Sequence, residues 1–419
     1  MFEKIKGIFS KHSSLIAAGI YLALSAERMA AYLHDGRFWA EEGKYYFSAI
    51  SQMSFIGGLF FERNGHVEFL TNLVIAISAL APLKYAPLVS TYLSFALQCI
   101  PVFYLIKYHH RIGLTKIALC ALMIIAVGLP QAAEIWANSI NLHFHFALLA
   151  ALIAVLPASS EYRPAHTLPL LVMAGLSGIP ANFMTPVFLW LALREKNSLR
   201  WMQFSALLIT SIAQFCILYT NDFNAGPRDM GANPAIYWLA MLSHQIISPF
   251  LEYPEAKWCT NLLRQVLTWD AWAVTFAAIC STPILLLLRN AIITKDTQQK
   301  TILLSSFTLG VLSILGSLGE RWMYIAPISG GRYFYAANVL LAIYLFKTLW
   351  LCRPFFYKAI LVWLVAFSFM HTEHNMGGPD WLVSYKQAIM FNDKTIHIWP
   401  GGDEWTIPNF EYIKDALHE

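Results

Sequence analysis

Acidic side chains gather in a short stretch that begins at Asp35 and reads Asp-Gly-Arg-Phe-Trp-Ala-Glu-Glu-Gly-Lys-Tyr-Tyr. Its adjacent carboxylates, Glu41 and Glu42, are candidates for a general base. A carboxylate that loses part of its water near a membrane surface has a raised pKa and is a better proton acceptor. A solvated loop with ordinary acids is the alternative. The residues alone do not choose between Glu41 and Glu42.

A second polar stretch carries Glu134, Asn138 and Asn141 at spacings of four and three residues. On a helix these three side chains would share one face, close to His143. Polar groups at the entrance to an apolar segment usually point into a cavity or toward each other. A capped helix end is the alternative. His143 and His145 are two residues apart, which suits metal ligation from a helix poorly, so we expect no metal site here.

A third stretch, Ser-Gly-Gly-Arg-Tyr at 329–333, carries Arg332 and Tyr333. The forked guanidinium of Arg332 suits a phosphate, and the glycine pair allows the backbone to approach a ligand. The start of the following helix adds a partial positive charge. An arginine that reaches the membrane interface, anchored by Tyr333, is the alternative. Arg228, in a polar loop at 221–229, is a further candidate for substrate binding.

These residues are embedded in an unusually apolar chain of 419 residues, 57% hydrophobic and 13% charged, with a mean hydropathy of +0.51. Soluble domains carry about 25% charged residues, and a soluble core of this size could not bury so much apolar surface. The composition therefore predicts an integral membrane protein. The basic residues form short clusters between apolar runs, as cytoplasmic loops do, which argues against nucleic acid as a partner.

The apolar runs predict an all-α, polytopic bundle of transmembrane helices. Candidate crossings are the runs long enough to span a bilayer or half of one, at 14–33, 86–106, 114–130, 142–157, 167–178, 181–193, 201–219, 270–288, 302–319, 334–350 and 357–371. The first run resembles a signal peptide, but we expect an uncleaved first helix. The break at Ser177-Gly-Ile-Pro180 predicts a hairpin of two half-length helices.

One further apolar run, residues 66–82, decides the topology. Basic residues place the N-terminus and the 107–116 cluster inside, so an odd number of crossings must join the first loop to that cluster. Glu68, Thr71 and Asn72 give residues 66–82 a polar stripe, and we expect this run to lie flat at the membrane interface. Residues 41–52 are expected to form a shorter helix at the same surface.

About eleven crossings follow, with the N-terminus cytoplasmic and the C-terminus outside. Residues 1–371 form the helix bundle with its outer loops, and residues 372–419 form an outer tail packed on the bundle. On this topology Glu41, Glu42, Glu134 and Arg332 share the outer face.

In layout, most of the chain resembles the GT-C superfamily of membrane glycosyltransferases. The resemblance rests on Phe-Trp-Ala-Glu-Glu-Gly at 38–43, the Glu134 to Asn141 stretch, Gly-Arg-Tyr at 331–333 and Trp-Pro-Gly at 399–401, which look like uncharacterised bacterial relatives of that group. These motifs are short. Many members carry Asp in the first loop where glutamate stands here, which leaves both the identity of the base and the metal question open.

The resemblance implies a bundle with juxtamembrane surface helices in the first outer loop, in a bacterial inner membrane. It implies transfer of a sugar from a polyprenyl-phosphate donor to a glycan or lipid acceptor at the periplasmic face. Glu41 or Glu42 would act as the base, Glu134 would assist, and Arg332 would contact the donor phosphate. No cofactor is expected with certainty, and a divalent cation is left open, because Arg332 could replace it at the anionic leaving group.

Three other functions remain open. A transporter or lipid flippase would place its ionisable residues near the middle of the membrane, often within inverted repeats, and no repeat is evident here. Another membrane transferase, such as an acyl or phosphoglycerol transferase, would use a histidine-centred site, for which His143 and His145 are available. A non-enzymatic assembly factor is the remaining reading.

Overall fold

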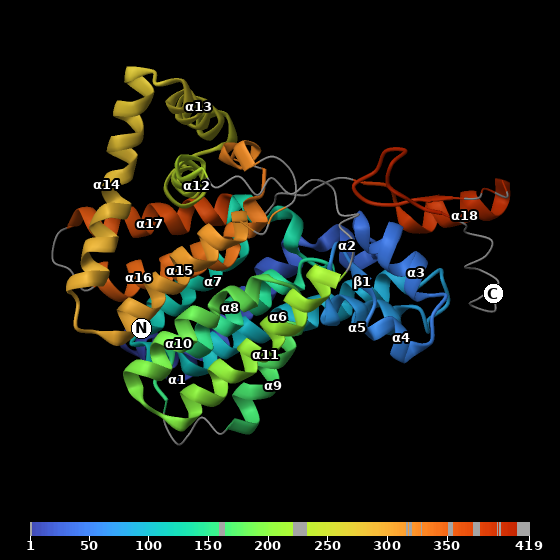
Figure 1. The fold of residues 1–419 in the computed structure, drawn as a ribbon, viewed down its shortest axis with the longest axis horizontal. Coiled ribbons are helices and arrows are strands. Elements are labelled where there is room, and N and C mark those ends of the chain that lie inside the picture. The colour runs from blue at the N-terminus through green and yellow to red at the C-terminus, as the bar shows by residue number, and fades with distance from the viewer. Residues whose placement is uncertain are drawn as a thin grey trace.

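The structure is a computed structural model that describes residues 2–158, 164–220, 233–315, 317, 321–327, 329–350, 355–371, 378–391, 393 and 395–408. The described residues are almost entirely helical (Figure 1). The only strands among them are two short antiparallel hairpins, β1 with β2 and β3 with β4. The expected all-α class is therefore confirmed.

The elements follow one another along the chain without a repeated unit. The first half contains α1 (Phe2–Arg28), α2 (Ala30–Asp35), a π-helical turn η1 (Glu42–Phe47), α3 (Ser48–Ile50), α4 (Phe55–Leu59), β1 (Glu62–Arg63), β2 (His66–Val67), α5 (Phe69–Ser78), α6 (Ala86–Ile112), α7 (Lys116–Gly128), η2 (Pro130–Ile135), α8 (Leu142–Val155), α9 (Pro164–Leu176), η3 (Pro180–Met184), α10 (Thr185–Glu195) and α11 (Ser198–Thr220). The second half contains α12 (Pro234–Met241), η4 (Leu242–Ile247), α13 (Tyr253–Arg264), η5 (Gln265–Thr268), α14 (Ala271–Ile293), α15 (Thr297–Leu315), η6 (Arg321–Ile325), η7 (Gly331–Phe334), α16 (Tyr335–Leu349), α17 (Phe355–Met370), α18 (Trp381–Phe391), β3 (Ile396–His397) and β4 (Thr406–Ile407).

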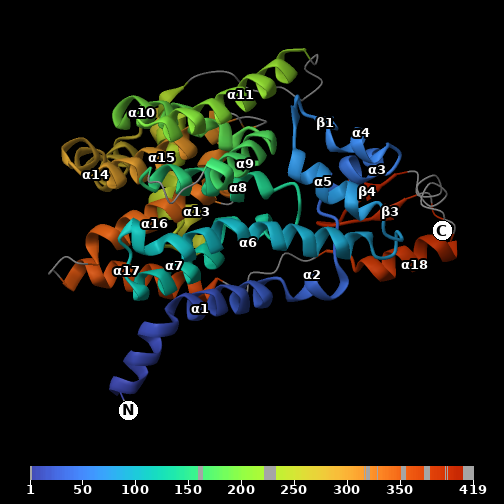
Figure 2. The same cartoon turned by 90° about the horizontal axis from the view of Figure 1, so that it is seen from below.

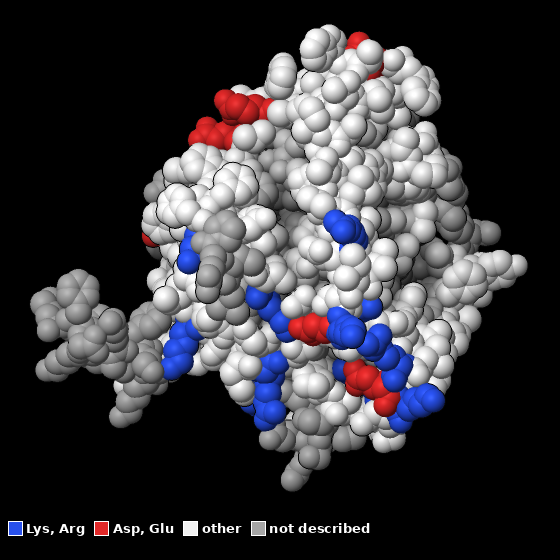
Figure 3. Space-filling view, turned by 90° about the vertical axis from the view of Figure 1, so that its left-hand side faces the viewer, with Lys and Arg blue, Asp and Glu red and all other residues white. Residues whose placement is uncertain are grey.

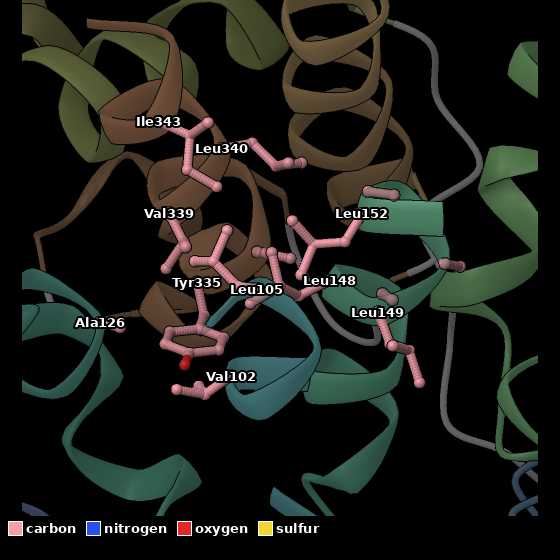
Figure 4. Packing of buried hydrophobic residues seen from close by; sticks show 14 of the residues in the cluster. Val102, Leu105, Ala126, Leu148, Leu149, Leu152, Tyr335, Val339, Leu340 and Ile343 are labelled. Atoms are coloured by element: carbon pink, nitrogen blue, oxygen red, sulfur yellow. The ribbon is translucent and has the colours of Figure 1, made fainter. Parts of the chain in front are cut away.

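The centre of the bundle is α8, which is apolar on every side and is buried over nearly its whole length. A helix without a polar face must be enclosed by other helices or by lipid. Here α6, α9, α15 and α16 surround it. In Figure 4, leucines of α8 interdigitate with Val102 and Leu105 of α6 and with Tyr335, Val339 and Leu340 of α16.

Every predicted crossing overlaps a helix of the structure, and the expected break at 177–180 separates α9 from α10. Among the described residues, three helices are long and apolar enough to cross a membrane by length and composition, namely α6, α11 and α14. Shorter apolar helices, including α7, α8 and α17, pack with them. The structure thus contains a helical bundle with membrane-compatible helices, and the number of crossings stays a prediction.

The segment predicted to lie flat forms α5, whose ten residues rise about 15 Å, half of a bilayer's hydrocarbon thickness. Its polar stripe does not face the membrane interface as expected. Thr71, Asn72 and Glu68 are buried inside the protein. The amide of Asn72 donates to the backbone oxygens of Leu59 and Phe61 at 3.1 and 2.8 Å. The stripe exists because these polar groups hold neighbouring loops.

Basic side chains gather at one end of the bundle. Segments predicted to be cytoplasmic meet at one end, where Gln298 donates to the backbone oxygen of Arg111 and Lys347 donates to Gln298, both at 2.8 Å. Figure 3 views this end and shows lysine and arginine side chains gathered over it. At the opposite end lie α2, α3, α4 and α18 (Figures 1 and 2). The segregation agrees with the predicted topology, and which end faces the cytoplasm stays a prediction.

One long apolar helix departs from the common direction. In Figures 1 and 2, α14 runs across the long axis of the molecule, whereas α6 runs along it. Its described neighbours include α13, α15 and η4. Because α14 diverges from α16 and α17, the structure does not show it as a crossing parallel to α6, and that crossing stays a prediction.

Candidate active site

A cavity of about 130 Å³ lies at the end of the bundle opposite the basic clusters. Segments that are far apart in the sequence converge on it: the first loop, the β1–β2 hairpin, the start of α8, the α9–α10 turn and η7. Its polar and aromatic lining consists of Glu41, Tyr46, Asn64, His66, Glu68, Asn141, His143, Phe144, Phe183, Ser313, Arg332 and Tyr333. Five of the residues singled out from the sequence therefore share one cavity, namely Glu41, Asn141, His143, Arg332 and Tyr333.

Arg332 forms an ion pair with Glu134, with Nη1 and Oε2 3.1 Å apart. Burial alone would lower the pKa of Arg332, but the charge of Glu134, followed by Tyr333 and Glu41, outweighs it, and the pKa is raised. The guanidinium side chain is 32% exposed, so it remains accessible from the cavity. Glu134 itself does not line the cavity. It sits behind Arg332 and orients it.

The stretch from Glu134 to Asn141 does not form one continuous helix. The 3₁₀ turn η2 ends at Ile135, and Ala137 has a positive φ of 54°, which no helix allows. The polar groups converge all the same. The amides of Asn138 and Asn141 both donate to the backbone oxygen of Glu134, at 2.6 and 3.1 Å. Asn138 is fully buried, so it shapes the loop instead of touching a substrate.

Glu42 lies outside the cavity and is fully buried. Its carboxylate accepts hydrogen bonds from the backbone NH of Trp39 at 2.9 Å, from the Ser90 hydroxyl at 2.6 Å, and from the NH and hydroxyl of Ser139 at 3.0 and 2.7 Å. Burial raises the pKa of Glu42, and these hydrogen bonds oppose that rise. With these partners, the Glu42 carboxylate connects the segments that carry Trp39, Ser90 and Ser139. Glu41 is then the first-loop acid that faces the cavity.

Glu68 is the principal cavity acid that the sequence analysis did not select as a site residue. Its side chain is 8% exposed. Its carboxylate oxygens lie 3.1 Å from Nε2 of His66, 2.9 Å from the Thr71 hydroxyl and 3.5 Å from Nδ1 of His143. Tyr46 lines the same cavity.

These neighbouring groups determine the charge of Glu68. Burial alone would raise the pKa of this carboxyl group, but the hydrogen bond from His66 and the nearby charges of His143 and His66 outweigh it, so the pKa is lowered. The two ring nitrogens of His66 face Asn64 O at 3.3 Å and Glu68 Oε1 at 3.1 Å. The cavity therefore holds a carboxyl group with a lowered pKa, with the rings of His66 and His143 beside it.

The position of His66 follows from a tight hairpin. Asn64 and Gly65 both have positive φ, 53° and 76°, the two-residue turn that an Asn-Gly pair favours. The amide side chain of Gln214 in α11 pairs with both backbone groups of Val67, at 3.0 and 2.8 Å. An Asn-Gly pair followed by a carboxylate at the edge of an apolar run is the sequence signal that could have identified Glu68.

The remaining predicted residues have distinct positions. Tyr333 packs edge-on against Phe144 and Tyr324, with ring centroids 5.4 and 5.5 Å apart. His145 points away from the cavity and packs against Trp136 at 5.4 Å. Arg228 lies outside the described residues. Within the part of the chain that the structure describes, no group of three or more His, Cys, Asp or Glu side chains is placed to hold a metal ion.

The described part of the tail contacts the segment that carries Glu41. The backbone oxygen of Trp399 accepts from Ala40 N at 2.6 Å, and the carboxylate of Asp35 accepts from Trp381 N at 2.5 Å. The Arg37 guanidinium is enclosed by the rings of Tyr32 and Trp399, at 3.5 and 5.1 Å from their centroids. The tail thus covers the first loop and holds its backbone in place.

The site combines two carboxylates, two histidines and one accessible guanidinium around a small cavity. Such a set can accept a proton from a hydroxyl group and bind an anionic group at the same time. Comparison with known proteins finds no match for this chain among protein-family models, curated proteins or solved structures.

Proposed function

We propose that this chain is a membrane glycosyltransferase that moves a sugar from a polyprenyl-phosphate donor to a glycan or lipid acceptor. The observation that carries the proposal is the convergence of Glu41, Glu68 and Arg332 on one cavity, at the end of the bundle opposite the basic clusters. A base for the acceptor and a cation for the leaving phosphate are the two groups that this transfer requires.

In the proposed reaction, the oxygen of an acceptor hydroxyl forms a bond to the anomeric carbon of the donor sugar. The bond from that carbon to the phosphate oxygen breaks, and its electron pair leaves with the lipid phosphate. Glu68 takes the hydroxyl proton, with Glu41 as the other cavity carboxylate. Arg332 pairs with the departing phosphate while Glu134 holds the guanidinium in place.

The location of the acids favours this function over transport. A transporter would bind its cargo near the middle of the membrane. Here the described carboxylates of the site stand at one end of the bundle, where the helices α8 and α16 begin. We place this end at the periplasmic face of a bacterial inner membrane, in accordance with the predicted positions of the basic loops.

The test compares Glu68→Gln, Glu41→Gln and Arg332→Lys with the matched control Glu255→Gln, an exposed acid on α13. Each purified protein is given a panel of synthetic polyprenyl-phosphate sugars together with membrane extract as acceptor, and release of polyprenyl phosphate is followed. We expect Glu68→Gln to lower turnover by about 10²–10⁴-fold, the contribution of a positioned general base.

Arg332→Lys should lower turnover as well, because lysine cannot form the forked contact. Glu255→Gln should match the native protein. Native turnover in all three site variants would overturn the site. If the donors of the panel bind but no sugar is transferred, and the protein instead moves cargo into vesicles, transport would replace the proposed transferase function.

A further inference from the structure

The structure contains a second, larger cavity, of about 890 Å³, between α14, α16, α17 and η4. Most of its wall is apolar and includes Phe250, Pro283, Leu287 and Leu345. It shares no lining residue with the cavity of the candidate active site, which is called the acid cavity below. Its centre lies along the last turns of α16, roughly 20 Å from Arg332 by the rise of that helix. It therefore serves a different purpose from the candidate active site.

One end of this cavity is polar. Asn290, Thr294, Gln299 and Lys347 line it there, at the same end of the bundle where the basic clusters meet. The Lys347 ammonium donates to Gln298 at 2.8 Å and lies 3.3 Å from the Asp296 carboxylate. An ammonium has three donor hydrogens, and the contacts formed by the described residues use two of them.

Positive charge exceeds negative charge around this polar end. The last turns of α14, the connection to α15 and the first turn of α15 carry Arg289, Lys295 and Lys300, against the one acid Asp296. Leu286 and Ile293 on the rim are 51% and 62% exposed, so the apolar part of the cavity is continuous with the outer surface of α14. An occupant must therefore be apolar over most of its length and anionic at one end.

We propose that this cavity binds one anionic phospholipid from the surrounding membrane. An acyl chain fills the wedge that opens where α14 diverges from α16 and α17, and the phosphate lies near Lys347. Bound in this way, the lipid adds contacts between α14 and the bundle to those that α14 makes with α13, α15, η4 and η5. The proposal does not depend on the proposed enzymatic function.

The experiment uses the full-length protein in micelles, with trace phosphatidylglycerol or phosphatidylcholine that carries the same photoactivatable acyl chain. Cross-linked peptides are mapped by mass spectrometry. We expect the phosphatidylglycerol probe to label residues 283–294 and 341–349, and to do so more strongly than phosphatidylcholine. Leu287→Trp should lower this labelling about tenfold, the loss expected when roughly two buried methylene groups are excluded.

Matched variants separate the cavity from the general lipid coat. Leu285→Trp changes a neighbouring residue that is 54% exposed and does not line the cavity, so its labelling should equal that of the native protein. Lys347→Gln should reduce the preference for phosphatidylglycerol about fivefold, the effect of one basic residue near an anionic lipid. Lys358→Gln, an exposed lysine outside the cavity, should not change it.

Three outcomes would overturn the proposal. These are equal labelling of Leu287→Trp and Leu285→Trp, labelling spread evenly over the apolar surface, and equal labelling of the native protein by both lipids. Ile360→Trp, which fills the same cavity from α17, replaces Leu287→Trp if the latter elutes as an aggregate.

Discussion

The adjacent glutamates Glu41 and Glu42 have opposite surroundings. Glu41 is partly exposed and lines the cavity, whereas Glu42 accepts four hydrogen bonds from Trp39, Ser90 and Ser139. Because Glu42 does not line the cavity, an acceptor hydroxyl bound there could not reach its carboxylate. The two residues therefore have different functions in spite of their identical chemistry.

The first prediction concerns Glu42→Gln. The amide NH₂ of glutamine must face at least one of the donors that Glu42 accepts, so a buried donor loses its partner. We expect the free energy of unfolding to fall by about 1–3 kcal/mol, the cost of one unsatisfied buried polar group. Thermal unfolding of the detergent-solubilised protein measures this. The partly exposed Glu41→Gln is the control, and an unfolding midpoint that falls equally in both variants would contradict the assignment.

The second prediction concerns pH. The pKa of Glu68 is lowered in the folded protein, so its carboxylate stays ionised until the pH falls below the usual glutamate range. Activity that needs this carboxylate as a base is present above that lowered pKa and is lost as the pH falls through it. His66→Ala removes the hydrogen bond and the charge of His66, which both oppose burial, so the pKa of Glu68 should rise and the acidic limb of the pH–rate profile should move to higher pH. An unchanged acidic limb would exclude Glu68 as the base.

At the scale of elements, short irregular segments position the site residues, and the long helices form the framework that supports these segments. The β1–β2 hairpin brings His66 to Glu68, the 3₁₀ turn η7 carries Arg332, and the loop after η2 presents Asn141. These pieces are held by polar side chains on helices, as Gln214 of α11 holds Val67. Such polar residues inside apolar helices thus have a structural role, because they form hydrogen bonds that hold these loops in place.

The third prediction tests the hairpin with Gly65→Ala. Gly65 has a φ of +76°, and an added Cβ would approach the Leu218 side chain to 2.8 Å. We expect a loss of about 1–2 kcal/mol from the left-handed backbone, together with reduced turnover because His66 shifts. Gly19→Ala is the matched control, because nothing lies within 4 Å of its added Cβ and alanine favours the helix. Equal unfolding midpoints for the two variants would count against a strained turn.

At the scale of the whole molecule, the two cavities lie toward opposite ends of one helical bundle. The acid cavity is covered at its first loop by contacts to the tail, and the larger apolar cavity lies where the basic segments meet. Basic side chains gather at the end of the bundle where α6 ends, as they would at a negatively charged cytoplasmic membrane surface.

The fourth prediction concerns this orientation. We expect Lys84→Cys, at the start of α6, to react with a membrane-impermeant maleimide in intact spheroplasts. His110→Cys, an exposed position at the other end of the same helix, should react only after the membrane is opened. The native protein, with its own cysteines, is the labelling blank. Labelling of His110→Cys in intact spheroplasts, with Lys84→Cys protected, would invert the proposed topology.

How much could be predicted from the sequence differs between the fold and the site. The positions of the helices were predictable, because the length of an apolar run and its flanking basic residues are local properties of the chain. The polar stripe of α5 was identified correctly, but its direction was not, since an interfacial helix and a loop-fastening helix have the same spacing of polar residues. The spacing of Glu134, Asn138 and Asn141 would place them on one face of a helix, but the backbone turns at Ala137, and the side chains converge without a continuous helix.

By itself, the sequence determined that this protein is a helical bundle of membrane-like composition, with its acids and Arg332 in loops that gather at one end. Only the tertiary structure decided that Glu41 faces the cavity and Glu42 does not, and that Glu68 joins the site with His66 and His143. The physical reason is that the role of a carboxylate depends on its burial and its partners. Those partners come from distant parts of the chain, as Ser139 does for Glu42, and the spacing of residues in a sequence does not record which of them will meet.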